Sequence, residues 1–162
     1  MSRNEIQVEV QDSVQDSVQD SVQNSVQDSI QDSLPIHEEE ELYRENIIDH
    51  YRNPRNKFPL EKYTFSHKEN NPLCGDEVCI FLKLDSKHFV SEVSFTGQGC
   101  AISQASASLL SEHIKGTTLQ KIQQLQKEDI FKLLGISLSP GRVHCAVLSL
   151  KALHKGIEKN LK

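Results

Sequence analysis

The sequence predicts an α+β fold, in which a small, mainly antiparallel three-stranded sheet is covered on one face by helices. Apolar and polar residues alternate from residue 77 to residue 84 and again from 89 to 95, as they do in half-buried strands. Apolar residues recur every three or four positions before this region and after it, which indicates amphipathic helices. Consecutive strands between groups of helices are typical of a sheet with its helices on one side.

The first 41 residues differ in composition from the rest of the 162-residue chain. From Val10 to Leu34 a four-residue Val-Gln-Asp-Ser unit repeats, and a run of glutamates follows Pro35. One small apolar residue in four cannot bury enough surface to offset the entropy of ordering the chain. We therefore expect residues 1–41 to be a disordered, acidic, low-complexity arm, with a transient helix that docks on a partner as the alternative.

The folded domain is expected over residues 42–162. A helix is predicted from Glu39 to just before Pro54, because the residue before a proline avoids helical torsions. Its apolar face is expected to consist of Tyr43, Ile47, Ile48 and Tyr51. A weak strand follows around Tyr63 and Phe65.

Two further strands are expected as an antiparallel hairpin. The first runs from residue 77 to 84, and Asp85-Ser86-Lys87 connects it to the second. The second strand is predicted to place Phe89, Val93 and Phe95 on one apolar face.

Helices fill the remainder. One is expected from Ala101 to Ile114, with Gly116 as its C-terminal cap. Two short helices follow around residues 119–125 and 130–134, the second ending at Gly135. The last begins near Val143 and ends past Gly156.

Charge and apolar patterning exclude several classes of function. The first 42 residues carry a net charge of −10 and the rest +5, which together make the net −5 of the chain. Lysine and arginine form no stripe with interleaved aromatics, so no nucleic-acid partner is expected. No apolar run approaches the roughly 20 residues of a membrane span. Neither a secretory nor a mitochondrial leader is evident, so we expect a cytoplasmic protein without a membrane partner.

Three of the four cysteines stand at the edges of predicted elements. Cys74 precedes a strand, Cys100 is expected between a strand and a helix, and Cys145 in the first turn of a helix. At the start of a helix the unpaired amide groups and the dipole favour a thiolate, which applies to Cys100 and Cys145. Asp76 and His144 stand beside them and can supply an oxygen and a nitrogen. A tetrahedral zinc site or a partly non-cysteine iron–sulfur site is therefore chemically available.

The alternatives are simpler. A free cysteine is commonly a small buried hydrophobe, and this is our interpretation of Cys79, in mid-strand. His144 and Cys145 could be a base and a nucleophile, but adjacent helical residues point about 100° apart, which argues against a hydrolase. The other histidines, among them His50, are interpreted as solvated or structural.

Four motifs in order resemble the U-type iron–sulfur assembly proteins, the family of the NifU N-terminal domain, IscU and SufU. They cover the chain from residue 42 to about 156 and comprise Leu-Tyr-Arg-Glu-Asn-Ile-Ile-Asp-His-Tyr-Arg-Asn-Pro-Arg-Asn (42–56), Asn-Pro-Leu-Cys-Gly-Asp (71–76), Gly-Gln-Gly-Cys-Ala-Ile-Ser-Gln-Ala-Ser-Ala-Ser (97–108) and Arg-Val-His-Cys-Ala (142–146).

The resemblance implies a scaffold or sulfur carrier rather than a classical enzyme. It would accept sulfur from a cysteine desulfurase, hold zinc or iron and a transient [2Fe–2S] cluster, and deliver the cluster to recipient apoproteins. The implied ligands are Cys74, Asp76, Cys100 and Cys145, with His144 as a possible further one. Cys74 and Cys145 are the implied sulfur acceptors, supported by Arg142. The family aspartate is associated with a labile cluster.

The motifs are similar to more than one branch of the family. Asn-Pro-x-Cys-Gly-Asp and Arg142 resemble SufU, whereas His144 directly before Cys145 is an IscU-type feature. The segment 138–142 replaces the Leu-Pro-Pro-Val-Lys chaperone-docking motif of IscU, so a dedicated chaperone is not expected. The alternatives to a scaffold are a zinc-dependent sulfurtransferase partner of the desulfurase and, less favoured, a structural zinc module for protein interactions.

Overall fold

The computed structural model describes residues 36–161 of the chain, and the predicted disordered arm lies almost entirely outside them. The chain divides into two units between Glu39 and Glu40. The fold and the candidate site described below belong to the second unit. Within the described residues, no helix is both long enough and apolar enough to cross a membrane.

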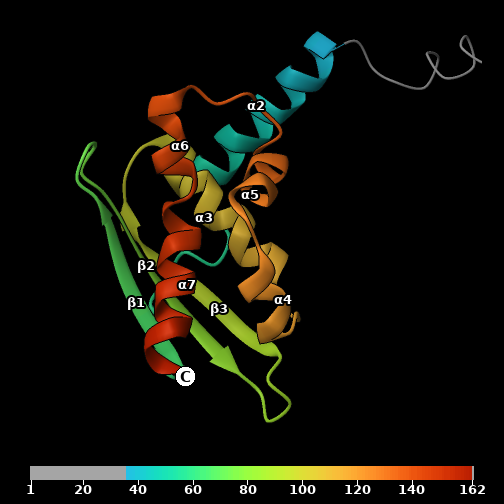
Figure 1. The fold of residues 1–162 in the computed structure, drawn as a ribbon. Helices are drawn as coiled ribbons and strands as arrows, with labels where there is room; N and C mark the ends of the chain where they lie inside the picture. The colour runs from blue at the N-terminus through green and yellow to red at the C-terminus, as the bar shows by residue number, and fades with distance from the viewer. Residues whose placement is uncertain (1–35, 162) are drawn as a thin grey trace, which may run out of the picture. The chain divides into compact units, whose positions relative to one another are not determined.

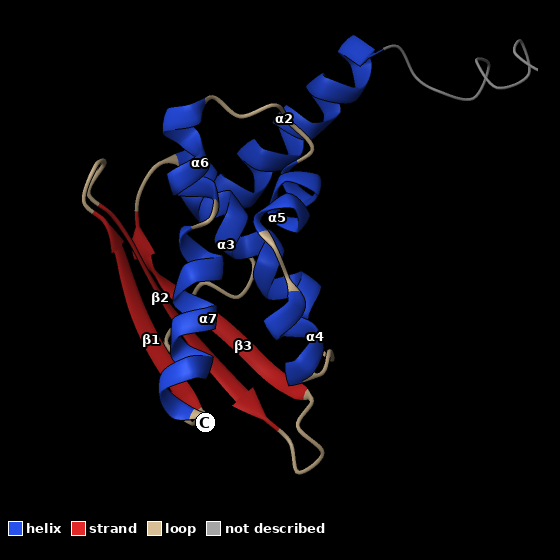
Figure 2. Cartoon of the chain, viewed as in Figure 1, coloured by secondary structure: helices blue, strands red, loops and turns tan. Residues whose placement is uncertain are grey.

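The sheet has three antiparallel strands in the order β1-β2-β3 (Figure 2). They are β1 (Phe65–Asn71), β2 (Asp76–Leu84) and β3 (Val90–Gln98). In β2 the side chains of Val78, Ile80 and Leu82 are buried, and the residues between them are partly exposed. This period of two is the one that the sequence predicted, and it buries one face of the sheet.

The register between β2 and β3 shifts at Lys83 and Leu84, so that Leu84 pairs with Val90. Val90 is consequently 1% exposed, whereas Phe89 is 40% exposed, precedes β3 and forms an isolated bridge to Thr118. The predicted apolar face with Phe89 was wrong at this position. A single β-bulge moves the residues beyond it to the opposite face of the sheet. The alternation of apolar and polar residues does not show where such a bulge lies.

Helices cover one face of the sheet, as predicted. Helix α3 (Ala101–Ile114) packs against β3, and α7 (Leu148–Asn160) packs against β1 and β2 (Figure 1). The core between these layers is formed by apolar side chains from the strands and both helices, among them Phe65, Leu82, Phe95, Leu110, Ile114, Leu148 and Leu153.

The helix α2 (Ile36–Arg52) begins three residues before the predicted start and ends before Pro54 as predicted. Of its four predicted core residues only Ile47 is buried, at 5% exposure; Tyr43, Ile48 and Tyr51 are between 41% and 47% exposed. The predicted apolar face of this helix was therefore wrong at three positions. Among the side chains of α2 whose burial is described, the second buried one is polar, His50, and a search for apolar periodicity could not find it.

Three shorter helices complete the fold: α4 (Leu119–Gln124), α5 (Lys127–Leu134) and α6 (Pro140–Ala146). Helix α5 begins with a capping box between Gln126 and Asp129 and ends at Gly135, whose φ of 65° favours glycine. The last predicted helix begins at Pro140 rather than near Val143, and it is divided at Val147 into α6 and α7.

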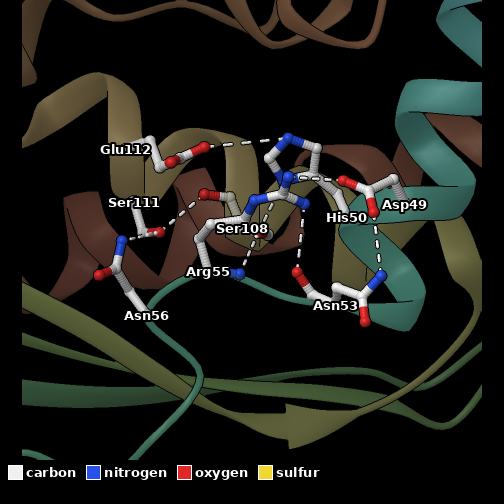
Figure 3. Close-up of polar contacts among 8 residues, drawn as sticks. All are labelled: Asp49, His50, Asn53, Arg55, Asn56, Ser108, Ser111 and Glu112. Carbon is white, nitrogen blue, oxygen red and sulfur yellow. Dashed lines mark hydrogen bonds and ion pairs between the residues drawn. The ribbon is translucent and has the colours of Figure 1, made fainter.

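A buried polar network joins α2 and the loop after it to α3 (Figure 3). The Ser108 hydroxyl lies 2.8 Å from Nδ1 of His50 and accepts a hydrogen bond from the backbone N–H of Arg55, also at 2.8 Å. Asn56 donates from its side chain to the Ser111 hydroxyl at 3.0 Å. Because each buried polar group has a partner, the network sets the position of α3 along its length.

Candidate metal centre

Three side chains from two distant parts of the chain converge at one end of the sheet. One ligand atom each of Cys74, Asp76 and Cys145 lies within 4.8 Å of the other two. The sulfur atoms of Cys74 and Cys145 are 3.5 Å apart, although 71 positions separate the two residues in sequence. This is the separation of donors that share one metal ion or one small cluster.

The loop between β1 and β2 carries Cys74. The Gly75 N–H donates to the Asn71 carbonyl at 2.9 Å, and Gly75 has a φ of 73°, which a side chain disfavours. The tight turn leaves Cys74 exposed at the surface. Of the two thiols in the ligand group, that of Cys74 is therefore the one that a partner protein can reach, because Cys145 is buried.

Asp76 is the first residue of β2 and is only 4% exposed. Its Oδ1 accepts a hydrogen bond from the Cys100 backbone N–H at 3.2 Å, whereas its Oδ2 is buried without a hydrogen-bond partner among the described residues. Burial raises the pKa of Asp76, but the nearby groups of Cys74, Ser103 and Cys100 outweigh it and lower that pKa below its usual value. A buried carboxylate with one free oxygen suits a cation as its missing partner.

Cys145 was predicted in the first turn of a helix, and this was wrong. It is the sixth residue of α6 and lies in its last turn, so the dipole of α6 does not favour its thiolate. Burial, together with neighbouring Cys74 and Cys100, raises the pKa of Cys145 to about 12. At neutral pH the side chain is therefore a neutral thiol until a cation displaces its proton.

Cys100 is the N-cap of α3, at the junction of strand and helix that the sequence predicted. It is half-buried. The three-residue ligand group does not include it, but its side chain contributes to the pKa shifts of both Asp76 and Cys145. Cys100 therefore lies next to Asp76 and Cys145 without being part of the three-residue group.

His144 and Arg142 lie on the exposed side of α6. His144 is outside the ligand group and lines a cavity of about 530 Å³ together with Leu73 and Leu148. Cys79 lies elsewhere, on the opposite face of the sheet, beside Lys68 and Thr96. Cys79 is half-exposed there, outside the core, so its interpretation as a small buried hydrophobe was wrong. Partial burial still raises the pKa of the Cys79 thiol.

The sequence did not indicate three neighbours of the site. Gly99 lies so close to Asp76 that a Cβ atom there would be 2.7 Å from the carboxyl carbon and 2.6 Å from the Ser103 hydroxyl. Asn71 donates from its side chain toward the Cys145 sulfur at 3.8 Å. All three residues stand in the motifs at 71–76 and 97–108, but a close approach of this kind is visible only in three dimensions.

The donor set fits the metals implied by the resemblance. Two thiolates and a carboxylate are ligands of zinc and of iron–sulfur clusters. The free Oδ2 of Asp76 and the 3.5 Å separation of the two sulfur atoms are the observations that support such a ligand set.

Comparisons with known proteins agree on one family. The model of the NifU-like N-terminal domain matches residues 42–162. The zinc-dependent sulfurtransferase SufU of Bacillus subtilis is 40% identical over 73% of this chain and 90% of its own length. The scaffold protein IscU of Aquifex aeolicus is 38% identical over 74% of this chain and 76% of its own.

Solved structures support the same fold. A SufU-type assembly scaffold from Fervidobacterium islandicum has a TM-score of 0.62 at 27% identity and covers 70% of this chain and 94% of that one. A NifU-like protein from Brucella abortus has a TM-score of 0.60 at 18% identity, covers 77% of this chain and 96% of that one, and supports the fold alone. The chain thus belongs to the family of NifU-like N-terminal domains, the U-type proteins of iron–sulfur cluster assembly.

Proposed function

We propose that this protein is a scaffold that accepts sulfur from a cysteine desulfurase, assembles a transient [2Fe–2S] cluster and delivers it to recipient apoproteins. The observation that carries the proposal is the convergence of an exposed thiol, a buried thiol and a buried carboxylate within 4.8 Å. Cys100 borders these groups and is proposed as the fourth ligand.

Cys74 is proposed as the first acceptor of sulfur because its thiol is exposed and that of Cys145 is 3% exposed. The Cys74 thiolate attacks the outer sulfur of the persulfide on the desulfurase. A new S–S bond forms on Cys74, and the cysteine of the desulfurase leaves as a thiolate, so the exchange needs no oxidant. Conversion of the transferred sulfur to cluster sulfide then takes two electrons from an external reductant.

Release of the cluster is assigned to Asp76. A carboxylate oxygen is a harder and less tightly held ligand for iron than a thiolate. Mixed ligation therefore makes the cluster easier to transfer than ligation by cysteines alone. The exposed side of the site at Cys74 supplies the approach for a recipient apoprotein, whose own thiolates replace those of the scaffold.

A second candidate function is that of a zinc-dependent sulfurtransferase. The relative from Bacillus subtilis bears this description at 40% identity. In this chain Cys74, Asp76 and Cys145, with Cys100, would hold zinc, and zinc would keep their thiolates ionised at neutral pH. The exposed Cys74 would again take the sulfur, and the product would be a persulfide rather than a cluster.

Two residues and two partners complete the proposal. Arg142 and His144 are exposed on α6 near Cys145. We propose that Arg142 supports sulfur transfer by contacting the partner protein, and that His144 acts as a further metal ligand or as a general acid or base. We propose a cytoplasmic setting with the desulfurase and recipient apoproteins as partners, and no dedicated chaperone.

Turnover of a cysteine desulfurase at increasing concentrations of the zinc-loaded protein tests both functions. Saturable stimulation that is lost in Cys74→Ala and kept in the matched Cys79→Ala supports the sulfurtransferase. Absence of stimulation, with a visible cluster once iron and sulfide are supplied, supports the scaffold. If neither response occurs and zinc is retained, the site is a structural zinc module and both candidates are wrong.

A further inference from the structure

We propose that Asn71 is a positioning residue of the metal centre, which donates a side-chain N–H hydrogen bond to the Cys145 sulfur and shapes the loop of Cys74. The inference rests on the proposed function, since it concerns the ligands that hold the metal or cluster. Asn71 is not itself a proposed ligand and acts through Cys145 and the loop of Cys74.

Asn71 occupies the last position of β1, directly opposite Asp76 in the ladder with β2. It is 6% exposed, in contrast to Asn70 before it, which is exposed. An amide side chain is costly to bury unless its donors and acceptor find partners. The position of those partners therefore indicates what the residue does.

The acceptor of the side chain faces the loop. Oδ1 accepts the backbone N–H of Leu73 at 3.1 Å, and the Asn71 backbone carbonyl accepts the N–H of Gly75 at 2.9 Å. These two hydrogen bonds hold the four-residue turn that carries Cys74. Asn71 thus fixes the exposed sulfur from one side.

The donor of the side chain faces the buried sulfur. Nδ2 lies 3.8 Å from Sγ of Cys145, 74 residues away in sequence. The orientation of the amide is determined, because a flip would turn its NH₂ group toward the N–H of Leu73 and its oxygen toward the sulfur. One residue therefore contacts both sulfur-bearing segments, which are 3.5 Å apart at their Sγ atoms.

An N–H donor to a thiolate ligand withdraws charge from the sulfur. Hydrogen bonds to sulfur are among the factors that set the reduction potential of iron–sulfur clusters, and the partners of metal ligands tune affinity. Asn71 is accordingly expected to raise the potential of a bound cluster and to make Cys145 a weaker electron donor than Cys74.

Asn71→Asp separates the two roles. Aspartate has the same shape and keeps the acceptor for Leu73, but it places an oxygen instead of an N–H group opposite Cys145. Asn70→Asp is the matched control, because it adds the same charge one residue away at an exposed position. Circular dichroism of both variants checks that the fold is kept.

The readout is the midpoint potential of the reconstituted cluster. We expect a lower potential in Asn71→Asp than in both wild type and Asn70→Asp. Equal potentials in the two aspartate variants would overturn the role of Asn71 as a hydrogen-bond donor to Cys145. Its hydrogen bonds within the loop of Cys74 would then be its remaining role.

A second measurement uses the unaltered, ¹⁵N-labelled chain with ¹¹³Cd in the site. We expect a scalar coupling from cadmium through the Cys145 sulfur to a side-chain amide proton of Asn71. Bound cadmium without this coupling would contradict the inference while the proposed function stands. Failure of the wild-type chain to hold cadmium, zinc or a cluster would refute the proposed function itself.

Discussion

The backbone N–H of Cys100 donates a hydrogen bond to Oδ1 of Asp76 at 3.2 Å. It joins the residue that caps α3 to the first residue of β2, so the two junctions that flank the site move together. The same bond occupies one oxygen of the carboxylate and leaves Oδ2 without a partner among the described residues.

Replacement of Asp76 by alanine is expected to lengthen the lifetime of a bound cluster. The substitution removes the proposed carboxylate ligand, and with it a more easily exchanged bond to iron than that of a thiolate. Transfer of the cluster to an apo-ferredoxin, followed by visible circular dichroism, measures the rate. Glu77→Ala, at the next position on the opposite face, is the control; an Asp76→Ala rate equal to that of wild type would count against the role in release.

Gly99→Ala is expected to displace Asp76 and reduce zinc affinity by roughly tenfold or more, the usual effect of disturbing the support of a metal ligand. A Cβ atom would stand 2.6 Å from the Ser103 hydroxyl and 2.7 Å from the Asp76 carboxyl carbon. Competition with a chromophoric chelator measures the affinity. Gly141→Ala, whose added Cβ would meet no described atom within 4 Å, should bind zinc as wild type does. If the two alanine variants bind equally, the contact at Gly99 does not position Asp76.

The stability of the fold is expected to fall as the pH drops below about 6.5, the unperturbed pKa of histidine. Burial, aided by the charge of Arg55, lowers the pKa of His50 in the folded state, although Glu112 and Asp49 act in the opposite direction. Between the two pKa values the unfolded chain binds a proton at His50 and the folded chain does not. The contribution of His50 to the free energy of unfolding is therefore fully present above pH 6.5 and is lost as the pH falls through the lower pKa of the folded state.

His50→Gln should flatten this part of the pH profile, because glutamine cannot take up the proton. Urea unfolding of metal-free protein between pH 5 and 8 measures the effect. His113→Gln, an exposed position on α3, should keep the slope of wild type. An unchanged slope in His50→Gln would assign the pH dependence to other groups.

Ser106→Ala is expected to destabilise the fold by about 1–3 kcal/mol. The buried Ser106 hydroxyl donates to the Ala146 carbonyl at 2.6 Å and lies 3.2 Å from the Ser149 hydroxyl. Its removal leaves the carbonyl next to Cys145 without this donor, at the break between α6 and α7. Chemical denaturation measures the loss, and a change below 0.5 kcal/mol, the usual range for surface substitutions, would contradict it.

The layers of the fold could be predicted from the sequence, because each strand and helix follows from the local spacing of its apolar residues. Alternation in β2 predicted the buried face of Val78, Ile80 and Leu82, and this prediction is confirmed. The helices α3, α4 and α5 occur close to where apolar spacing, Gly116 and Gly135 placed them. The motifs around the three cysteines also identified the family that the comparisons support.

The misplaced elements share a physical cause. One shift of register in β3 exchanged Phe89 for Val90, and one break at Val147 moved Cys145 to the end of a helix. Both the register shift and the helix break are changes at a single position, and tertiary packing rather than local spacing determines where such a change occurs. The buried side of α2 likewise depends on the hydrogen bond between His50 and Ser108, 58 residues apart.

The sequence by itself determined the α+β class, the family and the set of residues with metal-binding chemistry, because residue type and local spacing carry that information. Only the tertiary structure decided which of them meet. It exposes Cys74, buries Cys145 with its Sγ atom 3.5 Å from that of Cys74, and leaves Oδ2 of Asp76 without a hydrogen-bond partner among the described residues. It also brought Asn71 to the Cys145 sulfur. Contacts between residues more than 70 positions apart arise because α6 packs against α3 and α7 and so places Cys145 beside Asn71 and Cys74. No local pattern encodes them.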